Sequence, residues 1–396
     1  MARRLAAMLA AAVFAVSGCG GDAEPTSAAP QVDTSKLDPG NYPTTPLDLE
    51  QSRTDATGLK LEAIRIASVT PLLMEIDNRL VFEPATYVSR LVVPPNVESF
   101  LGTPVTPEGF DAVAPGLLSG WYTRGLRRAD MSLGLRATLY TLRFSTADQA
   151  ASAVRQLGDR MTGDPVTIPN HPAARATALA EHAILDPWLS AWLAHGDLVL
   201  HVEINDPLTR PFDPGNLATL AQRIFDAQIA ALQNFAPTPA DQVRSLPLDV
   251  DGLLSRTLPM EEGQRSGGMD PSALYPGQAA LHIENKPNLA KAAFEDSGVD
   301  YVTIAGTRVY RARDAASATR LSAALQAQSA DQYAPIESPP NLPGAQCLEL
   351  TDKYVYTSKH VCWITVGRYV ARVPHANVQG VHQRTSAQYI LLANGV

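Results

Sequence analysis

Three features are missing from this sequence or scarce in it. The amino-terminal apolar run, Leu5 to Val16, has about 12 residues, fewer than the ~20 that cross a bilayer as a helix. Lysine is scarce, with six among the 32 basic residues, while alanine and proline are abundant. This bias is typical of high-GC genomes and favours an actinobacterial source. The third missing feature is a recognisable catalytic motif.

The common catalytic and phosphate-binding motifs are absent. A serine hydrolase carries Gly-x-Ser-x-Gly at a strand-to-helix turn. Residues Gly116 to Gly120 have the wrong spacing, so we interpret them as a loop. No phosphate-binding Gly-x-x-x-x-Gly-Lys-Ser/Thr, no Gly-x-Gly-x-x-Gly and no zinc-binding His-Glu-x-x-His occurs. The sequence therefore names no catalytic residue and favours a protein that is not an enzyme.

Two pairs among the eight histidines are candidates for a metal site, His195 with His201 and His375 with His382. Residues six apart on a strand share a face but lie about 20 Å apart. A turn at Gly196 would change that separation. We therefore expect ordinary surface or hydrogen-bonded histidines, and we expect neither a metal nor another cofactor.

One acidic stretch resembles the opening of a calcium-binding loop. Asp249 and Asp251 precede Gly252, as the first ligands of such a loop precede its glycine. The loop requires a bidentate Glu at its twelfth position, where Met260 stands here. A capped turn is the favoured interpretation.

The first 19 residues are the most informative part of the chain. Arg3 and Arg4 precede the apolar run, which ends in Val16-Ser-Gly-Cys19. This pattern predicts a cleavable lipoprotein signal peptide over residues 1–18. The Cys19 thiol would then carry a diacylglycerol and its new amino terminus an acyl chain such as palmitate, and several chains together anchor a protein stably. We expect a lipoprotein on the extracytoplasmic face of the cell membrane.

Composition indicates a tether followed by two domains. Residues 19–45 are polar and rich in proline, and such a segment cannot bury enough surface to fold, so we expect a disordered tether reaching roughly 30 Å. The remainder is long enough for two domains, which we place at 46–240 and 241–396. Without Arg3 and Arg4 the chain has 30 basic and 40 acidic residues. Such an acidic protein is not expected to bind nucleic acid.

The two remaining cysteines, Cys347 and Cys362, are expected to form a disulfide, because paired thiols usually oxidise outside the cytoplasm. The alternative is a metal site. It needs two further ligands, and His360 is too close to Cys362 to serve well. A bridge closing a loop of about 15 residues should stabilise the fold by roughly 3 kcal/mol.

The body of the chain contains an internal duplication. The Ala-rich stretch at 150–155 recurs at 315–320, and Trp-x-x-x-Gly-x-x-Val-x-x-Val begins at both Trp192 and Trp363. Each copy predicts a strand, a helix capped by Asp148 or Asp314, a hairpin turning at Gly196 or Gly367, and a closing helix. The predicted fold is α+β, with two lobes related by duplication, each an antiparallel sheet with packed helices.

The duplication also bears on the tryptophans and the disulfide. Trp188, Trp192 and Trp363 can line a ligand cleft, because aromatic faces bind apolar or sugar surfaces. The equivalence of Trp192 and Trp363 favours core positions instead. Cys362 aligns with Ala191, so the bridge should belong to the second lobe and join neighbouring strands.

Several stretches resemble a family of actinobacterial cell-envelope lipoproteins that is known only as a domain of unknown function with a distinct carboxy-terminal domain. The stretches that carry the resemblance are Val32 to Thr44, Pro237 to Pro239, Leu246 to Leu254, Arg256 to Pro259, Ala293 to Asp300, and Val309 to Ala312. The resemblance spans nearly the whole mature chain. It implies an envelope location and two domains, but no activity, substrate or catalytic residue.

From these features we expect a non-enzymatic envelope protein, held to the membrane by its lipid, that binds a ligand or partner between its two lobes. A small hydrophobic envelope molecule is the first ligand to consider, because small-molecule sites concentrate at domain interfaces. An envelope protein is the other partner considered. The alternatives are an envelope hydrolase whose residues converge only in the folded chain, and a scaffold or signalling partner with a broad apolar surface.

Overall fold

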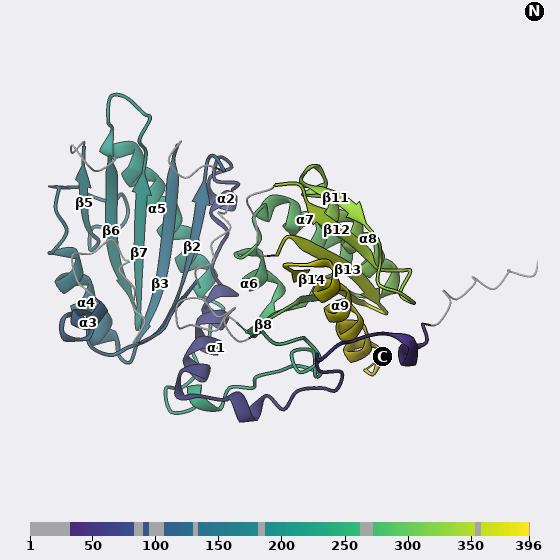
Figure 1. The fold of residues 1–396 in the computed structure, drawn as a ribbon. Coiled ribbons are helices and arrows are strands. Elements are labelled where there is room, and N and C mark those ends of the chain that lie inside the picture. The colour runs from purple at the N-terminus through teal and green to yellow at the C-terminus, as the bar shows by residue number, and fades with distance from the viewer. Residues whose placement is uncertain are drawn as a thin grey trace, which may run out of the picture.

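The computed structural model describes residues 32–82, 90–94, 107–129, 134–180, 187–261, 272–352 and 358–395. They form two lobes side by side, each built on an antiparallel sheet with helices, which confirms the predicted α+β fold (Figure 1). The expected signal peptide, Cys19 and the tether up to residue 31 lie outside the described residues. Within these ranges, every helix is too short or too polar to traverse a lipid bilayer.

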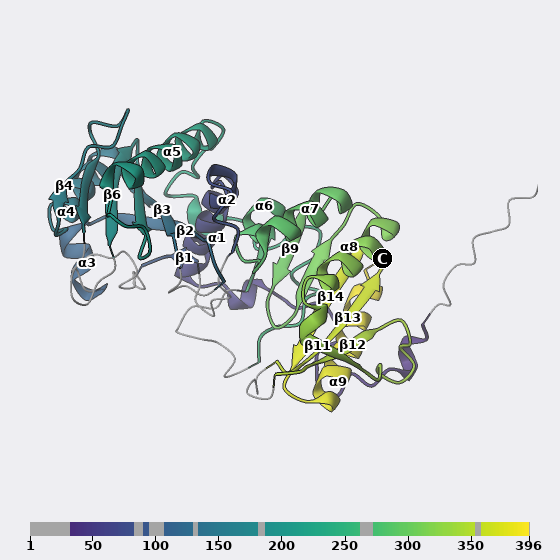
Figure 2. The ribbon, with the colours of Figure 1, turned by 90° about the horizontal axis from the view of Figure 1, so that it is seen from above.

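The first lobe is a seven-stranded sheet with the order β1-β2-β3-β7-β6-β5-β4. Its strands are β1 (Leu91–Val92), β2 (Leu117–Leu126), β3 (Arg136–Phe144), β4 (Asp164–Pro165), β5 (Arg175–Leu179), β6 (Trp188–His195) and β7 (Leu198–Asn205). Its helices are α1 (Asp55–Ala67), α2 (Leu73–Ile76), α3 (Pro107–Val113), α4 (Ala147–Gly158) and α5 (Pro214–Leu232). Helix α5 packs on one face, and α3 and α4 pack on the other (Figure 2).

The second lobe is a seven-stranded sheet with the order β8-β9-β10-β14-β13-β12-β11. Its strands are β8 (Ala273–Pro276), β9 (Tyr301–Ile304), β10 (Arg308–Arg311), β11 (Tyr333–Ile336), β12 (Gln346–Leu350), β13 (His360–Val366) and β14 (Tyr369–His375). Its helices are α6 (Gly277–Leu281), α7 (Pro287–Ser297), α8 (Ala315–Ala327) and α9 (Val378–Ala393). Helix α9 covers one face, and α7 and α8 cover the other.

The two sheets have the same topology, as a duplication predicts. Adding seven to each strand number of the first sheet gives the strand order of the second. The Ala-rich repeats fall on the equivalent helices α4 and α8. Gly196 and Gly367 both have positive φ, +59° and +53°, in the hairpins after β6 and β13. A residue without Cβ adopts this left-handed conformation at little cost.

The two Ala-rich helices are capped differently. The Asp314 carboxylate accepts a hydrogen bond from the Ser317 amide at 2.7 Å, as predicted. The prediction for α4 was wrong, because its cap is Thr146, which accepts from the Gln149 amide at 3.2 Å. Helix α4 begins two residues earlier than expected, at Ala147, so Asp148 lies within its first turn. A negative charge there still interacts favourably with the positive helix end.

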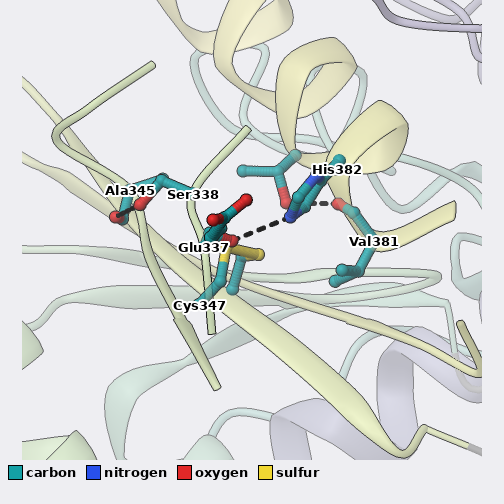
Figure 3. The surroundings of a disulfide bond; sticks show 8 residues. Glu337, Ser338, Ala345, Cys347, Val381 and His382 are labelled. Atoms are coloured by element: carbon teal, nitrogen blue, oxygen red, sulfur yellow. Dashed lines mark hydrogen bonds between the residues drawn. A yellow bond between two sulfur atoms is a disulfide. The ribbon is translucent and has the colours of Figure 1, made fainter. Parts of the chain in front are cut away.

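The disulfide joins Cys347 on β12 to Cys362 on β13, which confirms the predicted bridge (Figure 3). The two residues lie directly opposite one another, with their Cα atoms 4.0 Å apart. The equivalent pair in the first lobe is Ala176 opposite Ala191, so the bridge belongs to the second copy alone. Near the bridge, His382 on α9 donates from Nε2 to the Glu337 carbonyl at 2.9 Å. This hydrogen bond connects α9 to the loop between β11 and β12.

One continuous apolar core connects the lobes. It contains Ile64 and Ile66 of α1 and Trp121 of β2 from the first lobe, and Tyr275 of β8 and Leu281 of α6 from the second. The ring of Trp121 meets that of Tyr275 edge-on, with centroids 6.4 Å apart. Where these residues meet, side chains of both lobes pack against one another, because each lobe has an apolar strip along its edge that the other lobe buries.

A buried carboxylate fixes the segment that leads from the first lobe to the second. Glu62 on α1 is inaccessible to solvent and forms an ion pair with Arg143 at 2.6 Å. It also accepts hydrogen bonds from the Thr238 amide at 3.1 Å and the Thr238 hydroxyl at 2.7 Å. Further along, Asp249 accepts from the Leu254 and Ser255 amides at 2.7 and 2.9 Å, which is the capped turn predicted there.

Residues 32–47, which we name the amino-terminal strap, lie against the second lobe. The side chain of Asn341 donates to the Lys36 carbonyl at 2.9 Å, and the Tyr42 hydroxyl donates to Glu261 at 2.8 Å. Leu37 is buried, and the Arg384 guanidinium lies over the Tyr42 ring at 5.5 Å. Residues 32–45 had been assigned to the free tether. They contact the lobe because their few apolar side chains find partners there.

The seam should weaken at mildly acidic pH because of His282. Its Nδ1 accepts from the Thr123 hydroxyl at 2.8 Å, and its Nε2 donates to the Thr70 carbonyl at 3.0 Å, both across the seam. Burial lowers the pKa of His282 to about 4, from an ordinary value near 6.5. The unfolded chain therefore binds more protons between these values, and stability falls as pH drops through that window, by up to about 3 kcal/mol.

We expect His282→Gln to remove this pH-dependent loss, as measured by urea unfolding between pH 7.5 and 4.5. His195→Gln is the matched control, because His195 is exposed at the end of β6. An unfolding free energy that falls with acid equally in wild type and His282→Gln would contradict the assignment.

Candidate functional site

The second lobe contains a cavity of about 240 Å³ between the α6–α7 connection, the end of α8 and strands β10, β13 and β14. Its lining is rich in charge and aromatic rings. The cations are Lys286, Arg308 and Arg372, the carboxylate is Glu284, and the aromatic residues are Tyr310, Tyr333 and Trp363. A concave site with several convergent polar groups is the usual form of a small-molecule site.

Strand register places the central residues of this cavity. Trp363 on β13 lies directly opposite Arg372 on β14, and Arg372 lies opposite Arg308 on β10. Directly opposed residues project from the same face of a sheet, about 5 Å apart at Cβ. The three side chains therefore form one row across the sheet, on the face that carries α7 and α8.

Arg308 is already neutralised within the protein. Its guanidinium forms an ion pair with Glu284 at 2.7 Å, and the Tyr310 hydroxyl donates to the same carboxylate at 3.2 Å. Burial disfavours the charged guanidinium, but Glu284 outweighs that effect and raises the pKa of Arg308 above its ordinary value. Burial, with help from Glu284, also raises the pKa of Tyr310, which stays protonated. Arg308 and Glu284 thus cancel as charges.

Other donors that line the cavity have no partner among the described residues. The Arg372 guanidinium forms no ion pair or hydrogen bond with them, and the same is true of the Trp363 indole N–H. The Nε2 atom of Gln328 is buried and unsatisfied. Lys286 donates to the Gln328 carbonyl, a neutral group, so its charge is not balanced there. Such groups favour a ligand that brings acceptors and negative charge.

The equivalent row of the first lobe is a closed core. Trp192 stacks on His201 with ring centroids 3.6 Å apart, and His201 stacks on Tyr140 at 5.2 Å. All three side chains are inaccessible to solvent. Trp192 and Trp363 are thus equivalent in the fold, and both are largely buried. Trp363 also lines the second-lobe cavity, where Arg372 occupies the place of the stacking His201.

The first lobe brings a serine and a histidine into contact. The Ser190 Oγ lies 3.1 Å from His201 Nε2 and also accepts a hydrogen bond from the Trp192 indole at 3.0 Å. Both Ser190 and His201 are inaccessible to solvent, and His201 Nδ1 has no hydrogen-bond partner among the described residues. Burial lowers the pKa of His201 well below its ordinary range. A nucleophile must reach its substrate, so this pair serves packing.

The structure separates the histidines considered as metal ligands. His195 is exposed at the end of β6, whereas His201 is enclosed in the core. The His375 Nδ1 accepts from the Asn377 amide at 3.1 Å, and His382 binds a backbone carbonyl. No group of three metal-binding side chains occurs among the residues that the structure describes.

A larger cavity, of about 530 Å³, lies in the first lobe beside the start of α5. Its main charged groups are occupied. Arg79 and Arg223 both bind Asp77, at 2.8 and 3.0 Å, and the hydrogen bonds from Arg79 are the main reason that the pKa of Asp77 falls to about 2. Asp213 caps α5 by accepting from the Gly215 amide at 2.9 Å. The charged groups of this cavity already have partners within the protein, so it is a weaker candidate for a ligand site than the second-lobe cavity.

Sequence reasoning did not single out Lys286, Arg308, Gln328 or Arg372. One signal was available for Arg372. In the repeated Val-x-x-Val segment, the residue before the second valine is His201 in the first copy and Arg372 in the second. The change from a stackable ring to a guanidinium marks the copy with the cavity. Lys286 and Gln328 lie outside the repeated segments and carry no such signal.

Comparison with known proteins identifies both parts of the chain. Residues 49–248 match the N-terminal domain of unknown function DUF7373, and residues 253–395 match the C-terminal domain of DUF7373. No curated protein matches the chain significantly. Among solved structures, the extracellular domain of PknH from Mycobacterium tuberculosis is similar at 12% identity and a TM-score of 0.26, over 47% of this chain and 100% of its own. This likeness is too remote to carry a conclusion.

The two arginines of the cavity should differ in their effect on stability. Removing Arg308 leaves Glu284 without its cation. We expect Arg308→Gln to cost about 2 kcal/mol, below the ~3–5 typical of a fully buried pair, because the Arg308 side chain is 23% exposed. Arg372→Gln should change the unfolding free energy by less than about 0.5 kcal/mol, since it breaks no interaction. Urea denaturation measures both, and equal losses would contradict the assignment.

Proposed function

The chain belongs to the DUF7373 family, and on that premise we propose that it is a lipid-anchored protein of the cell envelope that binds a small anionic ligand in the cavity of its second lobe. The unpaired donors of that cavity are the observation that carries this proposal. Arg372 and Lys286 leave two positive charges unbalanced after Arg308 and Glu284 cancel. Trp363 and Tyr333 offer ring faces to the rest of the ligand.

The chemistry of the cavity favours an anionic ligand over the small hydrophobic molecule considered first from the sequence. A purely apolar molecule would leave Arg372, Gln328 Nε2 and the Trp363 N–H desolvated without acceptors, at a cost of about 1–3 kcal/mol for each unsatisfied group. A phosphate or carboxylate group provides those acceptors, and Arg binds both in a bidentate manner. The head group of an anionic lipid and a free phosphorylated or carboxylated metabolite share this chemistry.

A binding role without catalysis agrees with the contents of the cavity. Its carboxylate, Glu284, is engaged by Arg308 and Tyr310, and its remaining polar groups are cations, amides and hydroxyls. General acid–base catalysis requires a group that is free to exchange its proton with the substrate, whereas Glu284 is held by these two partners. A scaffold role has less support, because the exposed large apolar side chains among the described residues, Leu208, Leu289 and Val378, lie on separate elements.

The strap bears on how the cavity would face the membrane. The chain meets the second lobe from Val32 onward, so only residues 20–31 separate that lobe from the proposed lipid on Cys19. At about 3.5 Å per residue this segment spans at most about 45 Å. The second lobe, with its cavity, is therefore the part of the protein held near the membrane, where anionic head groups gather.

The ligand proposal predicts binding that depends on Arg372. Isothermal titration of the soluble chain starting at Gly20 with glycerol 3-phosphate, inorganic phosphate and citrate should give binding with at least one, weakened by salt. Flotation with phosphatidylglycerol vesicles separates a lipid head group from a free anion. Arg372→Gln should weaken binding at least tenfold, whereas Arg223→Gln, at the first-lobe cavity, should not. Absence of binding to every probe, or equal binding by Arg372→Gln, would overturn the proposal.

The anchor proposal predicts acylation at Cys19. Cells that express the full chain and are fed a clickable fatty acid should label wild type and not Cys19→Ala. The control Cys362→Ala should keep the label, because that residue lies in the folded second lobe. Equal labelling of wild type and Cys19→Ala would contradict the anchor proposal. The ligand proposal would be unaffected, because the titration tests it separately.

A further inference from the structure

A row of polar side chains crosses the face of the first sheet that also carries α3 and α4. Ser190 on β6 lies directly opposite Glu203 on β7 and Thr177 on β5. Glu203 lies opposite Thr138 on β3, and Thr138 lies opposite Arg124 on β2. Five neighbouring strands thus present hydroxyl, carboxylate and guanidinium groups side by side on one face.

The matching row of the second sheet is apolar. It runs from Leu348 on β12 to Val361 on β13 and Pro374 on β14. Because the two lobes share one topology, the sheet itself does not require polar side chains at these positions. We therefore expect the polar row to serve a function that is specific to the first lobe.

Several groups of this face have no partner among the described residues. The Glu203 carboxylate forms no ion pair or hydrogen bond with them, and the Oγ1 atom of Thr177 is buried and unsatisfied. His201, whose Nε2 contacts Ser190, has a buried and unsatisfied Nδ1 atom as well. Burial raises the pKa of Glu203 to about 7, against the opposing effect of Arg124 and Arg136. Unsatisfied buried polar groups are uncommon in folded proteins and call for an explanation.

The next row along the same face supplies an aromatic ring and an amide. Trp188 and Asn205 lie opposite one another, two residues along their strands from Ser190 and Glu203. Both are half-buried, and neither side chain has a hydrogen-bond partner among the described residues. With strands about 4.8 Å apart and same-face residues about 7 Å apart along a strand, the two rows form a patch roughly 10 Å by 7 Å. A single sugar ring covers an area of that order.

We propose that this patch of the first lobe binds a neutral sugar, with Glu203, Thr177 and Asn205 hydrogen-bonding its hydroxyl groups and Trp188 packing on its ring. A sugar hydroxyl both donates and accepts, so it can satisfy the carboxylate, the amide and the threonine together. The aliphatic face of a sugar packs well on an indole.

Charge at the patch argues against an ion as ligand. Arg124 and Arg136 lie near Glu203 and disfavour a cation, and the carboxyl group of Glu203 itself lies among the hydrogen-bonding groups of the patch, where it would repel an anion placed against it. The second-lobe cavity differs in that its carboxylate, Glu284, is already engaged by Arg308 and Tyr310. The two sites are independent, because they lie in different lobes and share no residue.

The test uses the soluble chain from Gly20 and saturation-transfer difference NMR with methyl glucoside, methyl galactoside, methyl mannoside and trehalose. At least one of these sugars should receive saturation and shift the Trp188 indole N–H signal. Trp188→Ala and Glu203→Met should each lower the affinity at least tenfold. Asp164→Asn, an exposed carboxylate on β4 of the same sheet, and Arg372→Gln in the other lobe should bind like wild type.

Glu203→Met separates a binding role from a structural one. It removes a buried carboxyl group that forms no ion pair or hydrogen bond with the residues described, so the variant should be at least as stable as wild type in urea, and weakened sugar binding then cannot result from unfolding. If Trp188→Ala does not fold, Glu203→Met alone decides the question. Failure of all four sugars to receive saturation, or undiminished binding by Glu203→Met, would overturn the proposal.

Discussion

A guanidinium group is not stably enclosed among apolar side chains unless it has a partner. This constraint explains the main difference between the two lobes. In the first lobe, Trp192, His201 and Tyr140 stack into a sealed core, because a neutral imidazole can be buried between rings. In the second lobe, Arg372 takes the place of His201, and a buried charge without a partner is costly. The layer stays open there, and the cavity beside Trp363 is the result.

The seam and the strap give this cavity its setting. The lobes share one core through α1, Trp121 and α6, so a ligand cannot enter between them where those side chains meet. Glu62 holds the connecting segment, and Tyr42 with Arg384 holds the strap on the second lobe. The duplication thus provides two copies of one sheet, and substitutions on the same face give each copy its own polar chemistry: a cationic cavity in the second lobe, and a row of hydroxyl and carboxyl groups in the first.

Much of the architecture was predictable from sequence, because it depends on periodic and repeated patterns. The two α+β lobes and the hairpins at Gly196 and Gly367 follow from the repeat, and the bridge between Cys347 and Cys362 follows from the two cysteines that remain beside Cys19. The cap of α4 was misplaced by two residues, because Thr146 and Asp148 are both good capping residues. The cavity was not predicted, because Lys286 before α7, Gln328 after α8 and Arg372 on β14 converge only in the folded chain, across long sequence separations. The shared core at the seam was not predicted for a related reason, since sequence does not show which apolar strips bury one another.

The most direct measurement is the anion affinity of Arg372→His together with its unfolding free energy. This substitution gives the second lobe the ring that seals the first, where His201 lies on Trp192 at 3.6 Å. At pH 8, where the imidazole is neutral, we expect the affinity of the variant for the anion to fall at least tenfold. Its unfolding free energy should be unchanged or higher, because a stacked ring replaces an unpaired charge. Wild-type anion affinity in this variant would contradict the account.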